Sequence, residues 1–290
     1  MKKILALLVV LMTVAGCSAS RSYSYLENGN EVLFKGPDNI SYTRNDLYKS
    51  LKLSAGDIII EDILKRIARQ STDIDIEAIE KEADELINSY ISNDLEAYIT
   101  ASYGSVDAYR SAYISSAIMN ALAELYATEN YDGLIAERKP IKMQVASFAE
   151  LENAEKCIAD FNNAVTFDMA AANNSSVSTA QAQIYMDDDS TLDLEVKDYI
   201  NSTDTTGIST IITHVTTSTD ADGKEVETPS YYVLNIISRT PDEFKDEVIT
   251  ELAADVDQDT LTDYFLNKHE YSIYDQDLYE VLSTKNEVFK

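Results

Sequence analysis

The sequence has no tryptophan, two cysteines, four prolines and eight glycines in 290 residues. Two cysteines cannot build a disulfide framework. The scarcity of glycine and proline argues against an all-β sandwich, whose many tight turns need them, and favours helices. Basic residues are also few: 23 lysines and arginines face 51 acids, giving a formal charge of −28. This charge excludes a nucleic-acid partner, because phosphates need a basic surface.

Long hydrophobic runs are missing as well, apart from one at the start. Residues 4–14 are apolar except for Thr13, and they follow two lysines. The run is shorter than the ~20 residues that a membrane-spanning helix needs. A short positive start followed by such a run is typical of an export signal. We therefore predict that residues 1–16 are a signal peptide.

The residues that end this run are Val14-Ala15-Gly16-Cys17. They resemble the lipobox of bacterial lipoproteins, and the alternative is an ordinary signal peptide next to a cysteine. The resemblance implies a lipid on the Cys17 thiol, with residues 17–39 as a lipidated tether. It predicts attachment to the extracytoplasmic face of the cell membrane through acyl chains. Cys157 then has no partner, and we interpret it as a buried residue of a helix rather than a nucleophile.

Residues 40–139 carry apolar side chains at helical spacing, as at Ile60, Ile63, Leu64 and Ile67. This periodicity predicts an all-helical region. Its first helix is expected after Thr43, which has the side chain of a helix N-cap.

The pattern changes after Pro140. We expect a strand over 141–146, a helix capped by Ser147 and Glu150, a loop over 173–190 and a helix over 192–200. Strands are expected over 208–215 and 231–237. Residues 140–240 are therefore predicted to form a small α+β domain.

Residues 241–290 return to helical spacing. Thr240-Pro241 is a strong helix start, and 271–275 alternates like a strand. The predicted fold class is α+β, with a mostly helical domain built from 40–139 and 241–290 and a second domain inserted into it.

This order resembles the PrsA-type extracytoplasmic foldase lipoproteins, relatives of the SurA chaperones. The resemblance lies in several segments along the chain. Two of them, 154–161 and 167–170, are similar to the first helices of a parvulin domain. The others are 40–49, 101–110, 207–209, 230–236 and 270–275. It implies a SurA-like chaperone domain with an inserted parvulin-like domain. Its implied activity is peptidyl-prolyl cis–trans isomerisation, and its implied partners are unfolded exported polypeptides.

The resemblance also implies a pocket with one histidine on the first strand of the parvulin domain and one on the last. This sequence contains only His214 and His269, and neither is at those positions. The last-strand position is occupied by Tyr232, which cannot titrate near neutral pH as histidine does. We therefore expect a degenerate parvulin domain with weak or no isomerase activity, and we assign no catalytic residue.

No cofactor or metal motif is present in the sequence. Asp187, Asp188 and Asp189 lack the ligand spacing of a calcium loop, so we interpret them as a solvated acidic loop. Three functions stay open: a membrane-anchored chaperone or foldase, an active isomerase with a rearranged pocket, and a ligand-binding lipoprotein. The oligomeric state is open too, with a homodimer among the alternatives.

Overall fold

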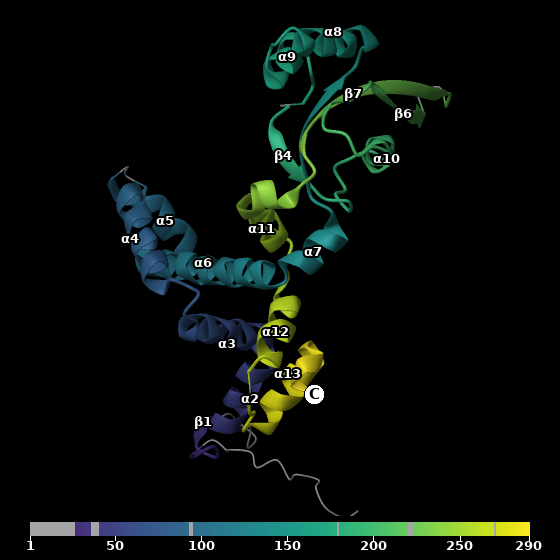
Figure 1. Ribbon diagram of the computed structural model, residues 1–290. Coiled ribbons are helices and arrows are strands. Elements are labelled where there is room, and N and C mark those ends of the chain that lie inside the picture. The colour runs from purple at the N-terminus through teal and green to yellow at the C-terminus, as the bar shows by residue number, and fades with distance from the viewer. Residues whose placement is uncertain (1–26, 36–40, 93–94, 179, 220–222, 270) are drawn as a thin grey trace, which may run out of the picture. The chain divides into compact units, whose positions relative to one another are not determined.

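The computed structural model describes residues 27–35, 41–92, 95–178, 180–219, 223–269 and 271–290 (Figure 1). The predicted signal peptide and Cys17 lie outside these residues. The chain divides into two compact units. The first unit consists of two segments, the residues up to Met119 and Asp257–Lys290. The second unit is Asn120–Val256.

The first unit begins with a small hairpin and continues in helices. The antiparallel strands β1 (Val32–Lys35) and β2 (Ser41–Thr43) lead directly into α2 (Arg44–Ser54). Thr43 caps this helix as expected: its Oγ1 accepts from the Asp46 N–H, and the Asp46 carboxylate accepts from the Thr43 N–H. The helices that follow are α3 (Gly56–Gln70), α4 (Ile76–Ser92), α5 (Glu96–Tyr103) and α6 (Val106–Glu129), which runs on into the second unit.

Two helices from the end of the chain complete the first unit. They are α12 (Gln258–Asn267) and α13 (Gln276–Lys285), and the short 3₁₀ helix η2 (Glu287–Phe289) follows them. α12 packs against α3, and α13 packs against both α2 and α3. The strand predicted over 271–275 is wrong: these residues are neither helix nor strand, and Asp275 instead accepts from the Leu278 N–H to cap α13.

The second unit contains an antiparallel sheet of five strands. They are β3 (Ile141–Phe148), β4 (Ala182–Tyr185), β5 (Gly207–Ile208), β6 (Ile212–Thr219) and β7 (Glu225–Ser238). The order is β4-β3-β7-β5, and β6 pairs with β7 on the same side as β5. Every pairing in this sheet is antiparallel.

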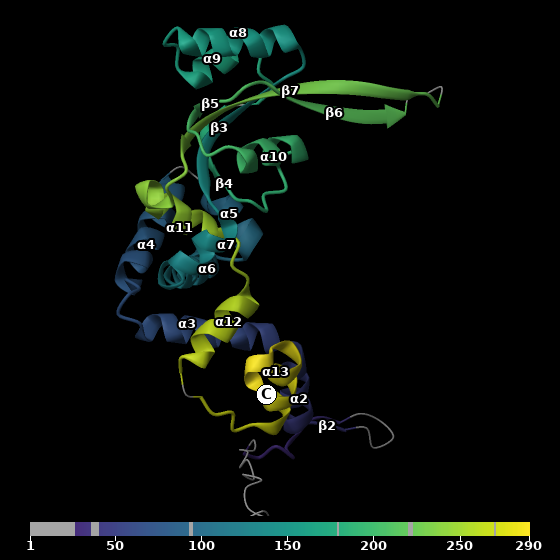
Figure 2. The same cartoon turned by 45° about the vertical axis from the view of Figure 1, so that its right-hand side comes forward.

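Helices cover both faces of the sheet (Figure 2). On one face, α8 (Leu151–Asn162) and α9 (Phe167–Asn173) pack over Ala146 and Val233 in a core that includes the buried Cys157. On the other face, α10 (Leu194–Ser202) packs over Met143 and Leu234. The alternation of strand side chains produces these two cores, because successive residues point to opposite faces. The unit also contains α7 (Tyr131–Arg138), the 3₁₀ helix η1 (Pro241–Phe244) and α11 (Lys245–Ala254).

The structure corrects four local expectations in this unit. The segment 173–190 is not all loop, since it contains β4. Ser147 does not cap α8: it lies inside β3, and its N–H donates to Ser178 Oγ over 3.1 Å. The strand expected over 208–215 is split into β5 and β6, and β7 begins at Glu225, earlier than expected.

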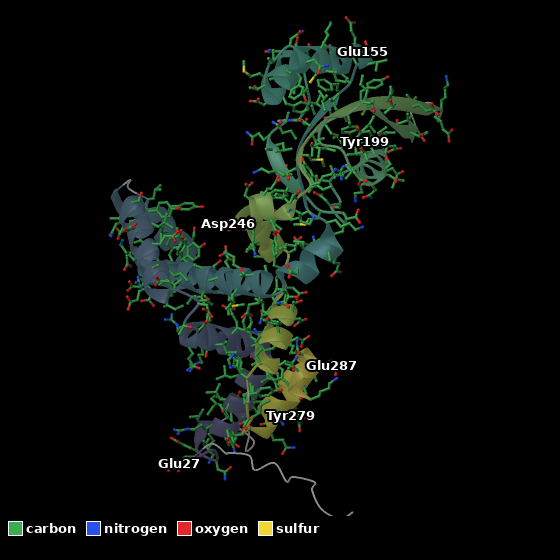
Figure 3. The ribbon with its side chains drawn as sticks, in the orientation of Figure 1. Glu27, Glu155, Tyr199, Asp246, Tyr279 and Glu287 are labelled. Atoms are coloured by element: carbon green, nitrogen blue, oxygen red, sulfur yellow. The ribbon has the colours of Figure 1, made fainter. Side chains whose placement is uncertain are left out.

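Acidic side chains are spread over the surface of both units, as Glu27, Glu155, Asp246 and Glu287 illustrate in Figure 3. In the part of the chain that the structure describes, no helix is both long and apolar enough to cross a membrane.

Candidate functional site

The α10 face of the sheet contains a cavity of about 280 Å³ that includes Tyr232. We call it the Tyr232 cavity. Strands β3, β4 and β7 and the start of α10 contribute its walls. The lining is Val145, Ser147, Ser178, Ala180, Gln181, Gln183, Tyr185, Thr191, Leu192, Asp193, Val196 and Tyr232. Eight of these twelve side chains carry a polar atom, and four are aliphatic, so the cavity suits a small group with both polar and apolar parts.

Tyr232 lies on β7 opposite Ser147 of β3. Its hydroxyl donates to Asp193 Oδ2 over 2.6 Å. Burial, together with the adjacent Asp193 carboxylate, raises the pKa of the Tyr232 hydroxyl to about 12. The phenol therefore stays protonated at neutral pH and acts as a hydrogen-bond donor, not as a base.

His214 lies in the same group of side chains. It is on β6, and its Nδ1 is 2.7 Å from Glu195 Oε2 on α10. Its Nε2 is 3.8 Å from Asp193 Oδ1. The hydrogen bond to Glu195, aided by both carboxylates, raises the pKa of His214 above its ordinary value. Asp193 thus connects Tyr232 to His214, which the sequence had placed apart.

Sequence reasoning missed Asp193 and Glu195. Asp193 is the N-cap residue of α10, but its side chain makes no capping hydrogen bond. The carboxylate is directed at Tyr232 and His214 instead. The sequence signal was present only as an acid before a helix, which is ordinarily a cap. Nothing in that signal indicated that the Asp193 carboxylate would face Tyr232 on β7 and His214 on β6.

The chemistry available at the Tyr232 cavity is limited to hydrogen bonding and charge. The neutral phenol donates, and the two carboxylates accept. Burial raises the pKa of Cys157, the thiol of the neighbouring core, to about 11, so it is not a nucleophile at neutral pH. The arrangement can hold a small apolar group beside a polar wall, but it offers no activated nucleophile.

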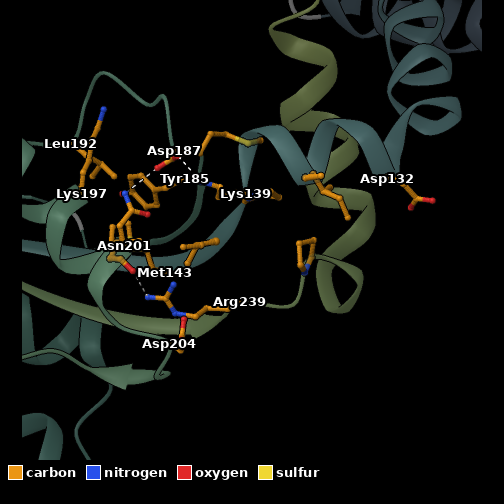
Figure 4. Close-up of a pocket in the computed structure, with 17 residues that line it drawn as sticks. Asp132, Lys139, Met143, Tyr185, Asp187, Leu192, Lys197, Asn201, Asp204 and Arg239 are labelled. Atoms are coloured by element: carbon orange, nitrogen blue, oxygen red, sulfur yellow. Dashed lines mark hydrogen bonds and ion pairs between the residues drawn. The ribbon is translucent and has the colours of Figure 1, made fainter.

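A second, larger cavity of about 610 Å³ lies in the same unit, and we call it the Arg239 cavity (Figure 4). Arg239 donates through Nη2 to the Ile200 carbonyl over 3.1 Å and through Nε to the Thr205 carbonyl over 3.3 Å. It thereby satisfies one carbonyl oxygen in the last turn of α10 and another in the segment between α10 and β5. The rest of the wall is mostly apolar, with Ile141, Met143 and other aliphatic residues.

Of the three consecutive acids Asp187, Asp188 and Asp189, Asp187 lines this cavity, and Asp187 and Asp188 also form ion pairs. Asp187 pairs with Lys139 over 3.1 Å and accepts from Asn201 over 3.1 Å. Asp188 pairs with Arg138 over 2.8 Å. These carboxylates hold the β4–α10 connection to the end of α7, and Asp187 and Asp188 are also exposed, as expected of a solvated acidic loop.

The sequence matches no protein-family model and no curated protein. Solved structures do match over most of the chain. The foldase protein PrsA of Streptococcus pneumoniae is 13% identical, with a TM-score of 0.42, covering 89% of this chain and 99% of that one. The peptidylprolyl isomerase PrsA of Bacillus cereus is 15% identical, with a TM-score of 0.41 and coverage of 90% and 100%. The foldase PrsA of Lactococcus lactis is 12% identical, with a TM-score of 0.42 and coverage of 86% and 97%.

All three matched structures are PrsA proteins.

Proposed function

We propose that this protein is a lipid-anchored, extracytoplasmic chaperone that binds unfolded exported polypeptides. The observation that carries the proposal is the exposed apolar surface of the first unit. β1 exposes Val32, Leu33 and Phe34 by 50%, 47% and 60%. On α2, Leu47 and Leu51 are 40% and 56% exposed. We call this set the apolar surface.

The position of these residues supports a binding role. Leu47 and Leu51 are four residues apart and share one face of α2. β2 connects β1 to that helix, so the apolar side chains come from adjoining elements. Folded proteins rarely leave several large apolar side chains exposed together unless a partner covers them. Unfolded chains supply matching apolar segments, while the formal charge of −28 keeps the complex soluble.

The test is the aggregation of a chemically denatured secreted protein, followed by light scattering with and without the full chain. We expect the wild-type protein to suppress scattering. Phe34→Ser with Leu51→Ser should suppress it less, because the double variant removes two exposed contacts. Met169→Ser is the matched control, since Met169 is 55% exposed on α9 in the other unit. Equal scattering with and without wild-type protein would reject the proposal. A double variant that dissociates a homodimer and still suppresses scattering would assign the surface to self-association.

We further propose that efficient prolyl isomerisation is absent. The eight residues of β3 include no histidine, and Val145 and Ser147 line the Tyr232 cavity from that strand. An isomerase must bind the twisted X–Pro amide better than the planar one. Here the β3 residue opposite Tyr232 is Ser147, not histidine, and the Tyr232 hydroxyl is already bound to Asp193.

The alternative is an isomerase that uses the group of Tyr232, Asp193 and His214, which the structure brings together. A protease-free prolyl-peptide assay separates the two. We expect no acceleration by the full chain. Acceleration that disappears in Tyr232→Phe and Asp193→Asn, but persists in the control Tyr199→Phe, would favour the alternative.

The third candidate, a ligand-binding lipoprotein, is supported less. Ligand crevices of open α/β sheets form at the carboxyl ends of parallel strands, whereas the five-stranded sheet is antiparallel throughout. The Arg239 cavity is its only specific support. A thermal-shift screen of small metabolites tests it, because a ligand that binds only the native state raises the Tm.

A further inference from the structure

The sheet of the second unit extends into a two-stranded arm. β6 pairs with β7 from Ile212 opposite Tyr232 to Thr219 opposite Glu225. β3, on the other side of β7, pairs only from Tyr231 onward. Among the described residues, 225–230 of β7 therefore have β6 as their one strand partner. We define the arm as 215–219 of β6 with 225–229 of β7, and Figures 1 and 2 show it projecting from the sheet.

The side chains of the arm are in solvent on both faces. All five residues of its β6 half and all five of its β7 half are exposed. An isolated two-stranded ribbon is at best marginally stable in water. It gains stability when a third strand hydrogen-bonds to its free edge and widens the sheet.

The two edges of the arm differ in how well they are protected against the addition of another β-strand. The β7 edge carries Glu225 and Glu227 and the proline Pro229, which has no N–H to donate. Charged residues and proline are the usual means by which proteins prevent strand addition. The β6 edge is Val215-Thr-Thr-Ser-Thr219, with no charge and no proline. Its β-branched residues favour an extended backbone. In such a strand, alternate residues direct their N–H and C=O groups away from β7, toward the open edge.

The base of the arm is fixed. His214, directly before the arm, pairs with Glu195 on α10 over 2.7 Å. Ile212 is buried against the same helix. The edge is therefore presented by a strand whose beginning is anchored, so a bound segment would meet a preformed template.

The charge of the arm indicates what it would bind. Glu227 lies opposite Thr217, and Glu225 lies opposite Thr219, so both acids are one strand away from the open edge. A second copy of this chain would bring another formal charge of −28 to that edge and be repelled. A lysine or arginine on an added strand has a side chain long enough to reach across a threonine toward either glutamate.

We propose that the free edge of β6 over 215–219 binds an extended, basic segment of an unfolded polypeptide as an additional β-strand. The proposal rests on the proposed chaperone function and names its client chemistry: alternating lysine or arginine with β-branched residues. Main-chain hydrogen bonds supply binding that is largely independent of sequence, and the two glutamates select for basic side chains.

The probe is a fluorescent ten-residue peptide of alternating lysine and valine, titrated into the full chain by anisotropy. A peptide of alternating glutamate and valine is its charge control. We expect the lysine peptide to bind at least roughly tenfold more tightly, because several charge contacts change sign together. Glu227→Gln should weaken the lysine peptide, whereas Glu155→Gln, an exposed acid of α8, should not. Equal binding of both peptides would overturn the proposal.

Backbone hydrogen exchange identifies the mode of binding. In a strand, successive N–H groups point to opposite edges, so the inward ones are already protected by β7. We expect the lysine peptide to protect every second amide over 215–219. Protection that falls elsewhere, with none added in β6, would overturn the proposal.

Proline substitutions provide the matched variants. Of Thr216→Pro and Thr217→Pro, one removes an outward donor and the other an inward donor. The outward variant should keep the arm and lose peptide affinity roughly fivefold or more. The inward variant should lose the β6–β7 amide protection itself. Unchanged peptide affinity in both variants would overturn the proposal.

The aggregation assay separates this inference from the proposed function. If wild-type protein suppresses scattering and the outward proline variant suppresses it equally for a basic client, the arm is not the client site and the chaperone function stands. If wild-type protein does not suppress scattering at all, the proposed function itself fails.

Discussion

Lys52 on α2 forms an ion pair with Asp275, 223 positions later in the chain, with Nζ 2.8 Å from Oδ1. A second carboxylate, that of Asp277, lies 2.9 Å from the same Nζ. The Lys52 and Asp275 side chains are only 8% and 15% exposed. The pair joins the segment that precedes α13 to α2, the first helix among the described residues, so segments far apart in the sequence build the first unit.

Lys52→Ala should destabilise the protein by about 2 to 4 kcal/mol, because it leaves the largely buried Asp275 carboxylate without a partner and next to a second acid. Urea unfolding of the full chain measures the effect. Lys81→Ala is the matched control: Lys81 forms an exposed ion pair with Glu85 at 3.5 Å, which is worth at most a few tenths of a kcal/mol. A Lys52→Ala protein as stable as the control would contradict the prediction.

The contribution of Lys52 to the free energy of unfolding should depend on pH at high pH. Burial alone would lower the pKa of Lys52, but its hydrogen bonds to Asp275 and Asp277 raise it above the ordinary 10.5. The pair's contribution to the free energy of unfolding is therefore complete below about pH 10.5 and is lost as the pH rises through the folded-state pKa. Urea unfolding at pH 9 and pH 11 should show a smaller difference between wild type and Lys52→Ala at the higher pH. An equal difference at both values would argue against it.

His214 should titrate above its ordinary pKa of 6.5, because Glu195 and Asp193 stabilise the imidazolium. A group whose pKa is raised on folding adds stability below its unfolded pKa and loses that contribution as the pH rises through the folded value. Wild type should therefore exceed His214→Gln in stability by more at pH 5.5 than at pH 8.5. In NMR titrations, Glu195→Gln should lower the His214 midpoint, and Glu243→Gln should leave it unchanged. A midpoint unaffected by Glu195→Gln would show that the pair does not form.

Cys157 should be unreactive in the native protein. Burial raises the pKa of its thiol from 9.0 to about 11, which reduces the thiolate fraction at pH 8 roughly hundredfold, and the side chain is fully buried. Iodoacetamide labelling followed by peptide mass spectrometry should modify Cys157 only in denaturant. Rapid labelling of the folded chain would mean that the α8 core opens readily. Cys157→Ser should cost about 1 to 3 kcal/mol, because it buries a hydroxyl without a partner.

Cys17 should carry the lipid that its resemblance to a lipobox residue implies. Mass spectrometry of the amino-terminal peptide from membrane-extracted protein should find a diacylglyceryl group on Cys17 and no residues before it. Cys17→Ser should move the protein out of the membrane fraction, while Cys157→Ser, which removes the other thiol, should not. An unmodified Cys17 in membrane-extracted protein would rule out the anchor.

Local signals predicted much of the secondary structure. The capping of α2 by Thr43 and the apolar period of α3 depend on neighbours within a turn or two, and the structure confirms them. The burial of Cys157, which was also expected, is confirmed too. The secondary-structure predictions were wrong where a residue distant in the sequence determines the local conformation. Ser147 reads as a helix cap, but pairing with β7 and a hydrogen bond to Ser178 keep it in β3. β4 is a strand because it pairs with β3, although its own residues have little periodicity.

The candidate site also combines features that the local sequence predicts with contacts that only the tertiary structure forms. Tyr232 was recognised as the residue at a family position, and His214 as a histidine away from one. Their common partner, Asp193, was not found, because a single acid before a helix carries no information on which strands will pass it. Residues 193, 214 and 232 meet only once β6 and β7 are paired and α10 is packed across them.

The sequence by itself determined the acidity of the molecule and most of its helix-forming segments, which follow from residue types and from their spacing along the chain. The lipid on Cys17 and the loss of the parvulin histidines stay predictions that the family resemblance implies. Only the tertiary structure decided that the last helices close the first unit through Lys52 and Asp275 and that Asp193 joins Tyr232 to His214. It also decided that β7 is the one strand paired with 215–219 of β6 among the described residues. Such contacts link residues far apart in sequence, and their formation depends on chain topology and burial, which no local pattern encodes.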